Sequence, residues 1–285
     1  MLRRMDAPRI VWHLEAERDP HGAPDPAREA PIGFPPPWAD RPWIFGVMVA
    51  SRNRVVAWKR RDGSDDPVLG VLGADPARPE RLADKRLMRT LRCYGDVSVG
   101  AQTLREQPNL VQLPREPGEP PAPELDEFRR RRGLPQYPRI IVYSLFGRLP
   151  LGNPVFHTPG VEVIVVTSER GADEMLRRGD TGLTKIVERV SEPAGLRRAH
   201  ARLFRECNVR HLACEGGMTV LSALREAGVL DEVFLTTTDA VVDTAAHVGV
   251  LTIFDFAQAG ARLFAEGRTA PGSGWLFQRW RFNER

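Results

Sequence analysis

Several stretches of the chain have the apolar, β-branched character of buried β-strands. They are residues 43–50 (WIFGVMVA), 97–99, 140–144, 161–167, 211–214 and 231–238. Short continuous apolar runs of this kind are typical of strands that are covered on both faces. Residues 275–282 instead alternate apolar and polar side chains, as an antiparallel edge strand or hairpin does. The pattern therefore predicts a buried sheet that ends in antiparallel strands.

Amphipathic helices are predicted between these strands. Residues 82–92 place Ala83, Leu87 and Leu91 on one stripe, and residues 193–207 keep one face apolar. Because strands and helices alternate along the chain, we predict an α/β protein with a mixed sheet.

Two proline-rich regions interrupt this pattern. Residues 1–40 contain many prolines, so we expect an N-terminal arm without regular structure. Residues 108–138 form a similar insertion with a predicted helix at 124–132, whose acidic start and arginine-rich end suit the helix dipole. The rest of the chain, residues 41–285, is predicted to be one domain that contains this insertion.

Residues 211–238 combine a strand, a Glu-Gly-Gly turn, a helix and a second strand in immediate succession. Gly216 and Gly217 stand where the helix is predicted to begin, so unpaired backbone amides and the positive end of the helix dipole meet there. Without Cβ atoms, the two residues let a diphosphate lie against the main chain. The glycines alone favour a simpler interpretation, a tight turn that needs glycine only for its backbone angles.

Composition and charge exclude several classes of protein. The chain has 285 residues, 42% of them hydrophobic, which is enough for a sizeable core. Its 41 basic and 37 acidic residues give a net charge of +4, too mild to indicate a nucleic-acid partner. Most of the basic residues are arginines, the better bidentate ligands for phosphate. Since neither a membrane-spanning run nor a signal-peptide core is found, we expect a cytoplasmic protein without a membrane partner.

The sequence also lacks the motifs of many catalytic and metal sites. No G-x-G-x-x-G follows a strand, and no phosphate-loop, H-E-x-x-H, C-x-x-C or G-x-S-x-G motif is found. The six histidines are scattered, and Cys93, Cys207 and Cys214 have no zinc spacing. We therefore predict no metal, expect reduced and buried thiols, and disfavour Ser or Cys nucleophilic catalysis.

Four blocks of sequence, in this order, are similar to one known family. They are RP with the strand and VVA that follow (41–57), LR followed by GAQTLR (91–105), RIIVYSLFGRLPL (139–151) and the Glu-Gly-Gly turn with its helix (215–221). On these blocks the chain resembles the reductase domain of bifunctional riboflavin-biosynthesis deaminase-reductases, in the dihydrofolate-reductase-like superfamily. The resemblance implies a three-layer α/β fold with a central mixed, mostly parallel sheet and an antiparallel C-terminal strand pair.

The resemblance further implies an NADPH-dependent reductase. Its small-molecule substrate would be a phosphoribosylaminopyrimidine, as for 5-amino-6-(5-phosphoribosylamino)uracil reductases, or a related heterocycle. The implied cofactor contacts are Val49, Thr103, Ser144, Gly216, Gly217, Met218, Thr219, Val220 and Leu221. The implied substrate contacts are Ser51, Arg92 and Glu215, and Asp84 is the candidate catalytic proton donor. Without the resemblance, the residue types favour ordinary strand-end and turn residues for Thr103 and Ser144 and a solvent-facing side chain for Asp84, while a helix surface and a helix cap are the alternatives for Arg92 and Glu215.

The sequence departs from the family's pattern in the substrate region. Where the family has S-x-D-G, this chain reads SRNR at residues 51–54, and Leu113 lies close to the position of a phosphate-binding arginine, with Arg115 nearby. The motifs of the zinc deaminase half are also missing. Two alternatives stay open: a dihydrofolate or other pterin reductase on the same fold, and a catalytically silent NADPH-binding protein. The resemblance also implies a homodimer.

Overall fold

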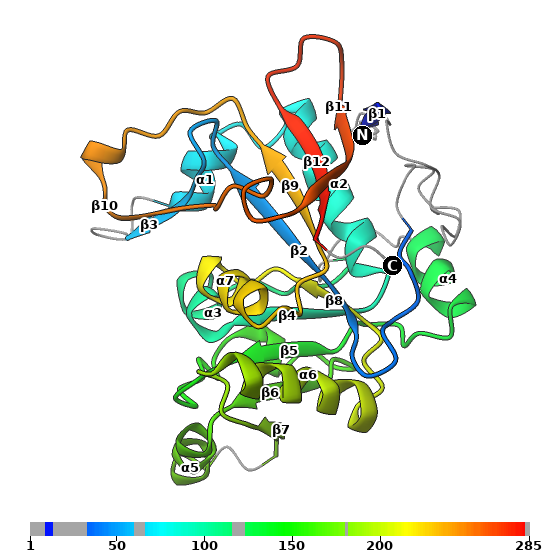
Figure 1. Cartoon of the computed structure of the whole chain (residues 1–285), viewed down its shortest axis with the longest axis vertical. Helices are drawn as coiled ribbons and strands as arrows, with labels where there is room; N and C mark the ends of the chain where they lie inside the picture. Colours follow the sequence, from blue (N-terminus) through cyan, green and yellow to red (C-terminus); the bar gives the residue numbers. More distant parts are fainter. Residues whose placement is uncertain (1–8, 14–32, 60–65, 116–122, 180–181, 283–285) are drawn as a thin grey trace. The chain divides into compact units, whose positions relative to one another are not determined.

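The computed structural model describes residues 9–13, 33–59, 66–115, 123–179 and 182–282 (Figure 1). Most of the predicted N-terminal arm, and residues 116–122 of the predicted insertion, lie outside these segments. The chain divides into two compact units, and each is described by itself. The larger unit holds residues 34–46 and 89–231, and the smaller one holds the described parts of 1–33, 47–88 and 232–285.

The larger unit contains a parallel sheet. Its strands, in hydrogen-bonded order, are the first half of β2 (Trp43–Ala50), β8 (His211–Cys214), β4 (Asp96–Gly100), β5 (Ile140–Tyr143), β6 (Val163–Thr167) and β7 (Thr184–Val187). Every neighbouring pair is parallel, as the continuous apolar runs predict. All residues of β4 and β6 are buried. The carboxyl ends of these strands therefore meet at one edge of the sheet.

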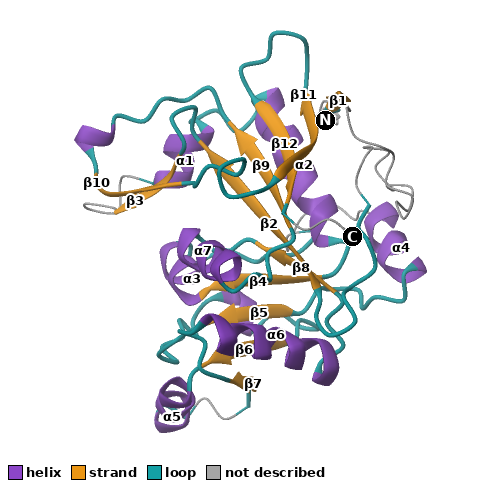
Figure 2. Cartoon of the chain, in the orientation of Figure 1, coloured by secondary structure: helices purple, strands orange, loops and turns teal. Residues whose placement is uncertain are grey.

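Helices flank the strands of the larger unit, and Figure 2 shows α6 lying across them. They are α3 (Ala101–Glu106), α4 (Pro123–Arg131), α5 (Glu169–Arg177), α6 (Pro193–Glu206), α7 (Met218–Glu226) and the end of α2 (Pro79–Arg92), with a 3₁₀ turn at Pro154–Phe156. A proline starts α6, and its predicted apolar face packs inward through Leu196, Ala199 and Leu203. The helix predicted in the insertion is α4, with acidic residues in its first turn and arginines in its last.

Four strands of the smaller unit are antiparallel neighbours. In order they are β1 (Val11–His13), β11 (Arg262–Arg268), β12 (Leu276–Arg281) and β9 (Glu232–Thr237), with the second half of β2 after β9. A separate pair joins β3 (Val55–Lys59) to β10 (Val248–Thr252), and α1 (Pro67–Leu72) and a 3₁₀ turn at Thr244–Ala246 complete the unit with the start of α2. The predicted α/β fold class, with its antiparallel C-terminal pair, is confirmed.

Of the two arrangements expected for residues 275–282, strand β12 takes the hairpin: it pairs antiparallel with β11 and is not an edge strand, because it lies between β11 and β9. Side chains alternate between the two faces of β12, and Phe277 and Arg279 lie on the buried face. The charge of Arg279 is neutralised there by Glu232. The Arg279 Nε donates to Glu232 Oε2 at 2.7 Å, and the Arg281 Nε donates to Glu232 Oε1 at 2.6 Å. Arg279 and Glu232 are both fully buried. The polar residue Arg279 in this alternating pattern therefore belongs to a buried ion pair and not to a solvent-facing surface of the sheet.

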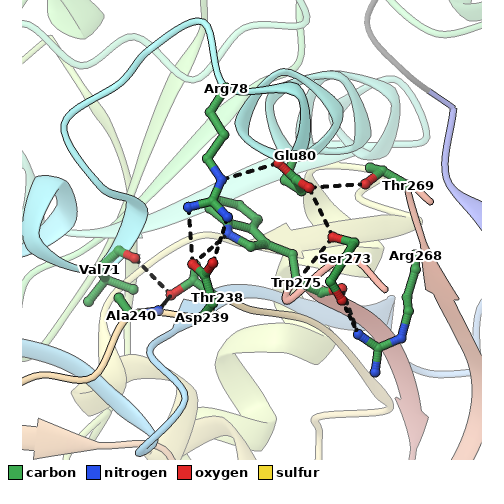
Figure 3. A network of polar contacts seen from close by, with 10 residues as sticks. All are labelled: Val71, Arg78, Glu80, Thr238, Asp239, Ala240, Arg268, Thr269, Ser273 and Trp275. Carbon is green, nitrogen blue, oxygen red and sulfur yellow. Dashed lines mark hydrogen bonds and ion pairs between the residues drawn. The ribbon is translucent and has the colours of Figure 1, made fainter. Parts of the chain in front are cut away.

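Figure 3 shows a polar network in the smaller unit, at the start of α2. The Arg78 guanidinium donates to both carboxylate oxygens of Asp239, at 3.1 and 2.6 Å, and its Nε donates to Glu80 at 3.1 Å. The indole of Trp275 donates to Asp239, and the hydroxyl of Ser273 donates to Glu80. The network ties α2 to the segment after β9 and to the loop between β11 and β12. Because the Arg78 and Asp239 side chains are 34% and 42% exposed, their charge attraction adds little stability.

Arg41, which opens the first family-like block, has a structural role in the larger unit. Its guanidinium binds the buried Asp231 carboxylate through two hydrogen bonds, of 2.7 and 2.8 Å. The same carboxylate accepts from the backbone amide of Ile44 at 2.8 Å. Arg41 therefore fixes the entry of β2 next to the segment that leads into β9.

Candidate functional site

A cavity of about 780 Å³ lies in the larger unit, at the carboxyl edge of its parallel sheet. Its lining residues are Gly100, Ala101, Gln102, Arg105, Tyr143, Ser144, Leu145, Phe146, Arg148, Leu149, Pro150, Arg178, Thr219 and Val220. They come from the ends of β4 and β5, from α3, from the first turn of α7, from the 144–150 loop and, for Arg178, from the end of α5. Open α/β sheets characteristically bind ligands at this edge.

The Glu-Gly-Gly turn packs against Gly100 and Val220, two residues that line this cavity. Gly217 caps α7 without a side-chain hydrogen bond, and its amide lies 3.4 Å from Thr103 Oγ1. A Cβ atom on Gly216 would lie 2.9 Å from the Gly100 nitrogen and 3.3 Å from the Val220 Cβ. On Gly217, an added Cβ would meet only the Thr103 hydroxyl, at 3.6 Å. Close packing therefore requires glycine at 216, a reason for glycine beyond turn angles.

The structure brings most of the predicted cofactor residues to this place. Ser144, Thr219 and Val220 line the cavity, and Thr103, Gly216 and Gly217 form the contacts just described. The side chains of Met218 and Leu221 are instead buried, with exposures of 8% and 0%. Those two side chains pack α7 into the core, so only their backbone groups remain for a ligand.

Arginines gather at one end of the cavity, and the sequence analysis did not single them out. Arg105, Arg148 and Arg178 line it, and the Arg105 Nη1 donates to the Arg148 carbonyl at 2.8 Å. A neighbouring hollow of about 340 Å³ shares Phe146 and Arg148 and adds Arg170, Glu174 and Arg177. The Arg170 guanidinium lies 5.6 Å from the centre of the Phe146 ring. Arg105 and Arg148 lie inside the family-like blocks, a signal that could have found them.

Arg92 and Glu215, the predicted substrate residues, form a buried ion pair. The Arg92 Nε and Nη2 donate to the two Glu215 carboxylate oxygens at 2.6 and 2.7 Å. The third guanidinium nitrogen, Nη1, donates to the Leu113 carbonyl at 2.9 Å. The two side chains are only 3% and 8% exposed. Each charge is therefore neutralised by its partner. Glu215 directly precedes Gly216, so the ion pair adjoins the Glu-Gly-Gly turn in the sequence.

Buried polar groups surround this ion pair. The Arg129 Nη1, from α4, donates to the carbonyls of Arg92 and Gly95 at 3.0 Å and of Cys93 at 3.2 Å. Arg129 thus caps the carboxyl end of α2, while its Nη2 has no hydrogen-bond partner. Gln112 is fully buried, and neither its amide nitrogen nor its amide oxygen has a partner. Burial lowers the pKa of Arg129.

The other predicted site residues, Asp84, Ser51 and Val49, lie in the smaller unit. The Thr236 hydroxyl donates to Asp84 Oδ1 at 2.5 Å, joining α2 to β9. Ser51 is fully buried and holds a turn, since its hydroxyl donates to Asn53 Oδ1 and accepts from the Val55 amide. The side chain of Val49 packs against a cluster of Val55, Trp58, Val71 and Val242.

Tyr143, a half-buried residue that lines the cavity, forms a polar pair with the fully buried His200. His200 Nδ1 lies 2.8 Å from the Leu196 carbonyl, which can only accept, so this nitrogen carries the ring proton. His200 Nε2 then accepts from the Tyr143 hydroxyl at 2.7 Å. Burial raises the pKa of Tyr143 well above its usual value and lowers the pKa of His200 to about 4. Both groups are therefore neutral at physiological pH.

This pair predicts a pH dependence of stability. Because the His200 pKa is about 4 in the folded protein, against an ordinary value of about 6.5, the unfolded chain binds more protons between these values. We expect His200 to remove about 3 kcal/mol from the free energy of unfolding as the pH falls from about 6.5 to 4. Urea titrations of wild type and His200→Gln across this range measure the difference. A wild-type protein that loses no more stability than the variant contradicts the expectation.

Three further features bear on the class of site. The described residues contain no group of three or more His, Cys, Asp or Glu side chains that could hold a metal ion. Within the same segments, every helix is too short or too polar to cross a lipid bilayer. The three cysteines are free thiols, of which Cys93 and Cys214 are buried as expected and Cys207 is half-buried.

Comparison with solved structures defines the class of fold as that of the riboflavin-pathway pyrimidine reductases. A pyrimidine reductase-like protein from Corynebacterium diphtheriae superimposes with a TM-score of 0.61 at 18% identity, over 86% of this chain and 94% of that one. RibD from Acinetobacter baumannii gives 0.60 at 15% identity, over 86% of this chain but only 59% of RibD. The riboflavin biosynthesis reductase Rib7 from Saccharomyces cerevisiae gives 0.56 at 13% identity, over 86% of this chain and 92% of Rib7.

These likenesses confirm the dihydrofolate-reductase-like fold that the four sequence blocks imply. The low identities establish the shared fold alone, and the chain spans about three fifths of the length of RibD. No protein-family model matches the chain, and no curated protein matches it in sequence.

Proposed function

We propose that the protein is an NADPH-dependent reductase that transfers a hydride to a phosphoribosylaminopyrimidine of the riboflavin-pathway type or to a related heterocycle. The observation that carries this proposal is the cavity at the carboxyl edge of the parallel sheet, which is lined by the first turn of α7 and by three arginines. Of its fold neighbours, Rib7 is named as a riboflavin biosynthesis reductase and another is named as a pyrimidine reductase-like protein. The homodimer and the cytoplasmic location stay predictions.

The lining residues fit a dinucleotide. At the Gly216 turn the main chain has no side chain of its own, and α7 starts there without a hydrogen bond from the side chain of its N-cap residue. Such a helix start favours a diphosphate, because its amides and dipole both face negative charge. Thr103 and Ser144 add hydroxyls at the same edge of the sheet. When bound, the nicotinamide supplies the hydride, while the protein positions the reactants and excludes water.

The arginine cluster supports NADPH over NADH. The two cofactors differ by one phosphate on the adenosine ribose, and Arg105, Arg148 and Arg178 give the cavity the positive charge that this phosphate needs. Phe146, with 53% of its surface exposed, offers a flat face beside them on which an adenine can stack. We therefore assign the arginine end of the cavity to the adenosine half of the cofactor.

A second candidate function, a pterin reductase, is favoured by one observation in the smaller unit. Asp84, which resembles the pterin-binding carboxylate of dihydrofolate reductases, is held by the Thr236 hydroxyl at 2.5 Å. An oriented carboxylate suits the amino and ring N–H groups of a pterin. Oxidation of NADPH by dihydrofolate, lost in Asp84→Asn, supports this candidate, whereas oxidation by a ribosylaminopyrimidine alone supports the first.

The cofactor assignment predicts a selective thermal shift. We expect saturating NADPH to raise the melting temperature clearly more than NADH does, because only NADPH engages the arginines. Arg148→Gln should weaken NADPH binding by roughly 10- to 100-fold, the worth of a charge-assisted hydrogen bond, and leave NADH binding little changed. Titration of cofactor fluorescence measures both affinities.

The matched control for this experiment is Arg205→Gln. Arg205 is an exposed arginine at the end of α6 and does not line the cavity, so its loss removes the same charge elsewhere. Equal weakening by both variants would mean that only overall charge matters. Absence of any NADPH binding contradicts the proposed function, and binding without turnover leaves a catalytically silent NADPH-binding protein.

A further inference from the structure

The hollow of about 340 Å³ in the larger unit adjoins the proposed cofactor cavity, because Phe146 and Arg148 line both. Its other lining residues, Arg170, Glu174 and Arg177, all come from α5. They stand at positions i, i+4 and i+7 of this helix, so they share one of its faces. One face of α5 therefore adds two arginines and a carboxylate beside the cavity.

The two walls of this hollow are fixed to each other by the backbone of the 144–150 loop. The Thr167 hydroxyl donates to the Ser144 carbonyl at 2.6 Å, and the Ser168 hydroxyl donates to the Leu145 carbonyl at 2.7 Å. Ser168 is also the N-cap residue of α5, so the loop is joined directly to the start of the helix. The hollow is therefore organised before a ligand binds, which lowers the entropic cost of binding.

Glu174 is the acidic residue of this hollow, and its side chain is only 21% exposed. A carboxylate beside an adenosine ribose accepts a hydrogen bond from the free 2′-hydroxyl of NADH and repels the 2′-phosphate of NADPH. Here the carboxylate has a partner, because the Arg177 Nη2 forms an ion pair with Glu174 Oε2. Once this pair is formed, the charges of Arg148 and Arg170 are in excess in the hollow.

We propose that the ion pair between Arg177 and Glu174 sets the preference for NADPH. Arg177 holds the carboxylate, and Arg148 and Arg170 bind the 2′-phosphate. The Arg170 guanidinium lies 5.6 Å from the centre of the Phe146 ring, so this phosphate lies beside the adenine that stacks there. The inference rests on the proposed function, because it places the adenosine ribose where the two hollows meet. Arg177 acts through Glu174 and is a positioning residue.

The test compares adenosine 2′,5′-bisphosphate with adenosine 5′-monophosphate, which lacks only the 2′-phosphate. Calorimetric titration of the wild type should show the bisphosphate binding at least about tenfold more tightly. In Arg177→Met this preference should fall by about fivefold or more, because an unpartnered carboxylate then faces the phosphate. Adding Glu174→Gln to the same chain should restore the preference. The melting temperature should change little in both variants, since Arg177 is 70% exposed.

The matched control is Arg177→Met combined with Asp173→Asn. Asp173 is an exposed acidic residue of α5 that does not line the hollow, so its change restores the same charge at another place. This variant should keep the reduced preference of Arg177→Met. The proposal is overturned if Arg177→Met retains the wild-type preference, or if Asp173→Asn restores the preference as fully as Glu174→Gln does.

Titration of the wild type with NADPH separates this inference from the proposed function. If the wild type binds NADPH but does not prefer the bisphosphate fragment, the role of the ion pair is refuted and the cofactor assignment survives. If the wild type prefers the bisphosphate and only Glu174→Gln rescues Arg177→Met, the role of the ion pair is supported. The same pattern without any NADPH binding refutes the proposed reductase alone.

Discussion

Replacing Glu215 by alanine is expected to lower the free energy of unfolding by about 3–5 kcal/mol, the usual effect of breaking a buried ion pair. The change leaves the Arg92 guanidinium, only 3% exposed, without its carboxylate. It also loosens the segment that Arg92 anchors through the Leu113 carbonyl. Urea unfolding followed by circular dichroism measures the loss.

The control for this prediction is the double variant Arg92→Met/Glu215→Leu. Apolar side chains of similar size often replace a buried ion pair with little loss of stability, so the double variant should recover most of the stability. Substrate binding should stay weak, because the anchor of the Leu113 segment is gone. A double variant as unstable as Glu215→Ala would show that the two charges do not stabilise each other.

Replacing Gly216 by valine is expected to weaken NADPH binding by more than about 100-fold, because a displacement near 1 Å at a binding site can cost that much. The first added atom would lie 2.9 Å from the Gly100 nitrogen and 3.3 Å from the Val220 Cβ. Both neighbours are held by secondary structure, so the start of α7 must move away from β4. Fluorescence titration with NADPH measures the affinity.

The adjacent glycine provides a close comparison. In Gly217→Ala the new Cβ meets only the Thr103 hydroxyl, at 3.6 Å, and we expect less than about a tenfold loss of affinity, consistent with the small cost of changing an N-cap glycine. If the two variants bind NADPH equally well, the close packing at Gly216 has no part in cofactor binding. If both lose all binding, the turn acts through backbone flexibility instead.

Much of the fold could be predicted because its elements carry strong periodic signals. The strand predicted at residues 43–50 is β2, and the helix predicted at 193–207 is α6, one residue shorter. Two other elements have no such signal. Helix α5 buries only Gly171 and Met175, and four of the five residues of β10 are exposed. An element that touches the core at one or two points leaves no pattern to detect.

The sequence predicts those site residues that follow strand ends along the chain. It does not predict contacts between residues that are far apart in the sequence. The Glu-Gly-Gly turn, Thr103 and Ser144 all stand at strand ends, which a parallel sheet brings to one edge. The pairing of Arg92 with Glu215 joins residues 123 positions apart. Neither that contact nor the buried amide of Gln112 leaves a local trace in the sequence. Such polar contacts depend on the packed structure and not on periodicity.

Because Arg129 caps α2, the insertion at residues 108–138 has a structural role in the larger unit. Residues 108–138 interrupt the regular alternation of strands and helices, so they look like the first candidates for deletion in a shortened protein. Yet they supply Arg129, which caps the carboxyl end of α2, and the Leu113 carbonyl, which accepts a hydrogen bond from Arg92. Shortening the chain there would remove the contacts that hold Arg92, one of the predicted substrate residues. Shortened or grafted variants of the protein should therefore retain residues 108–138.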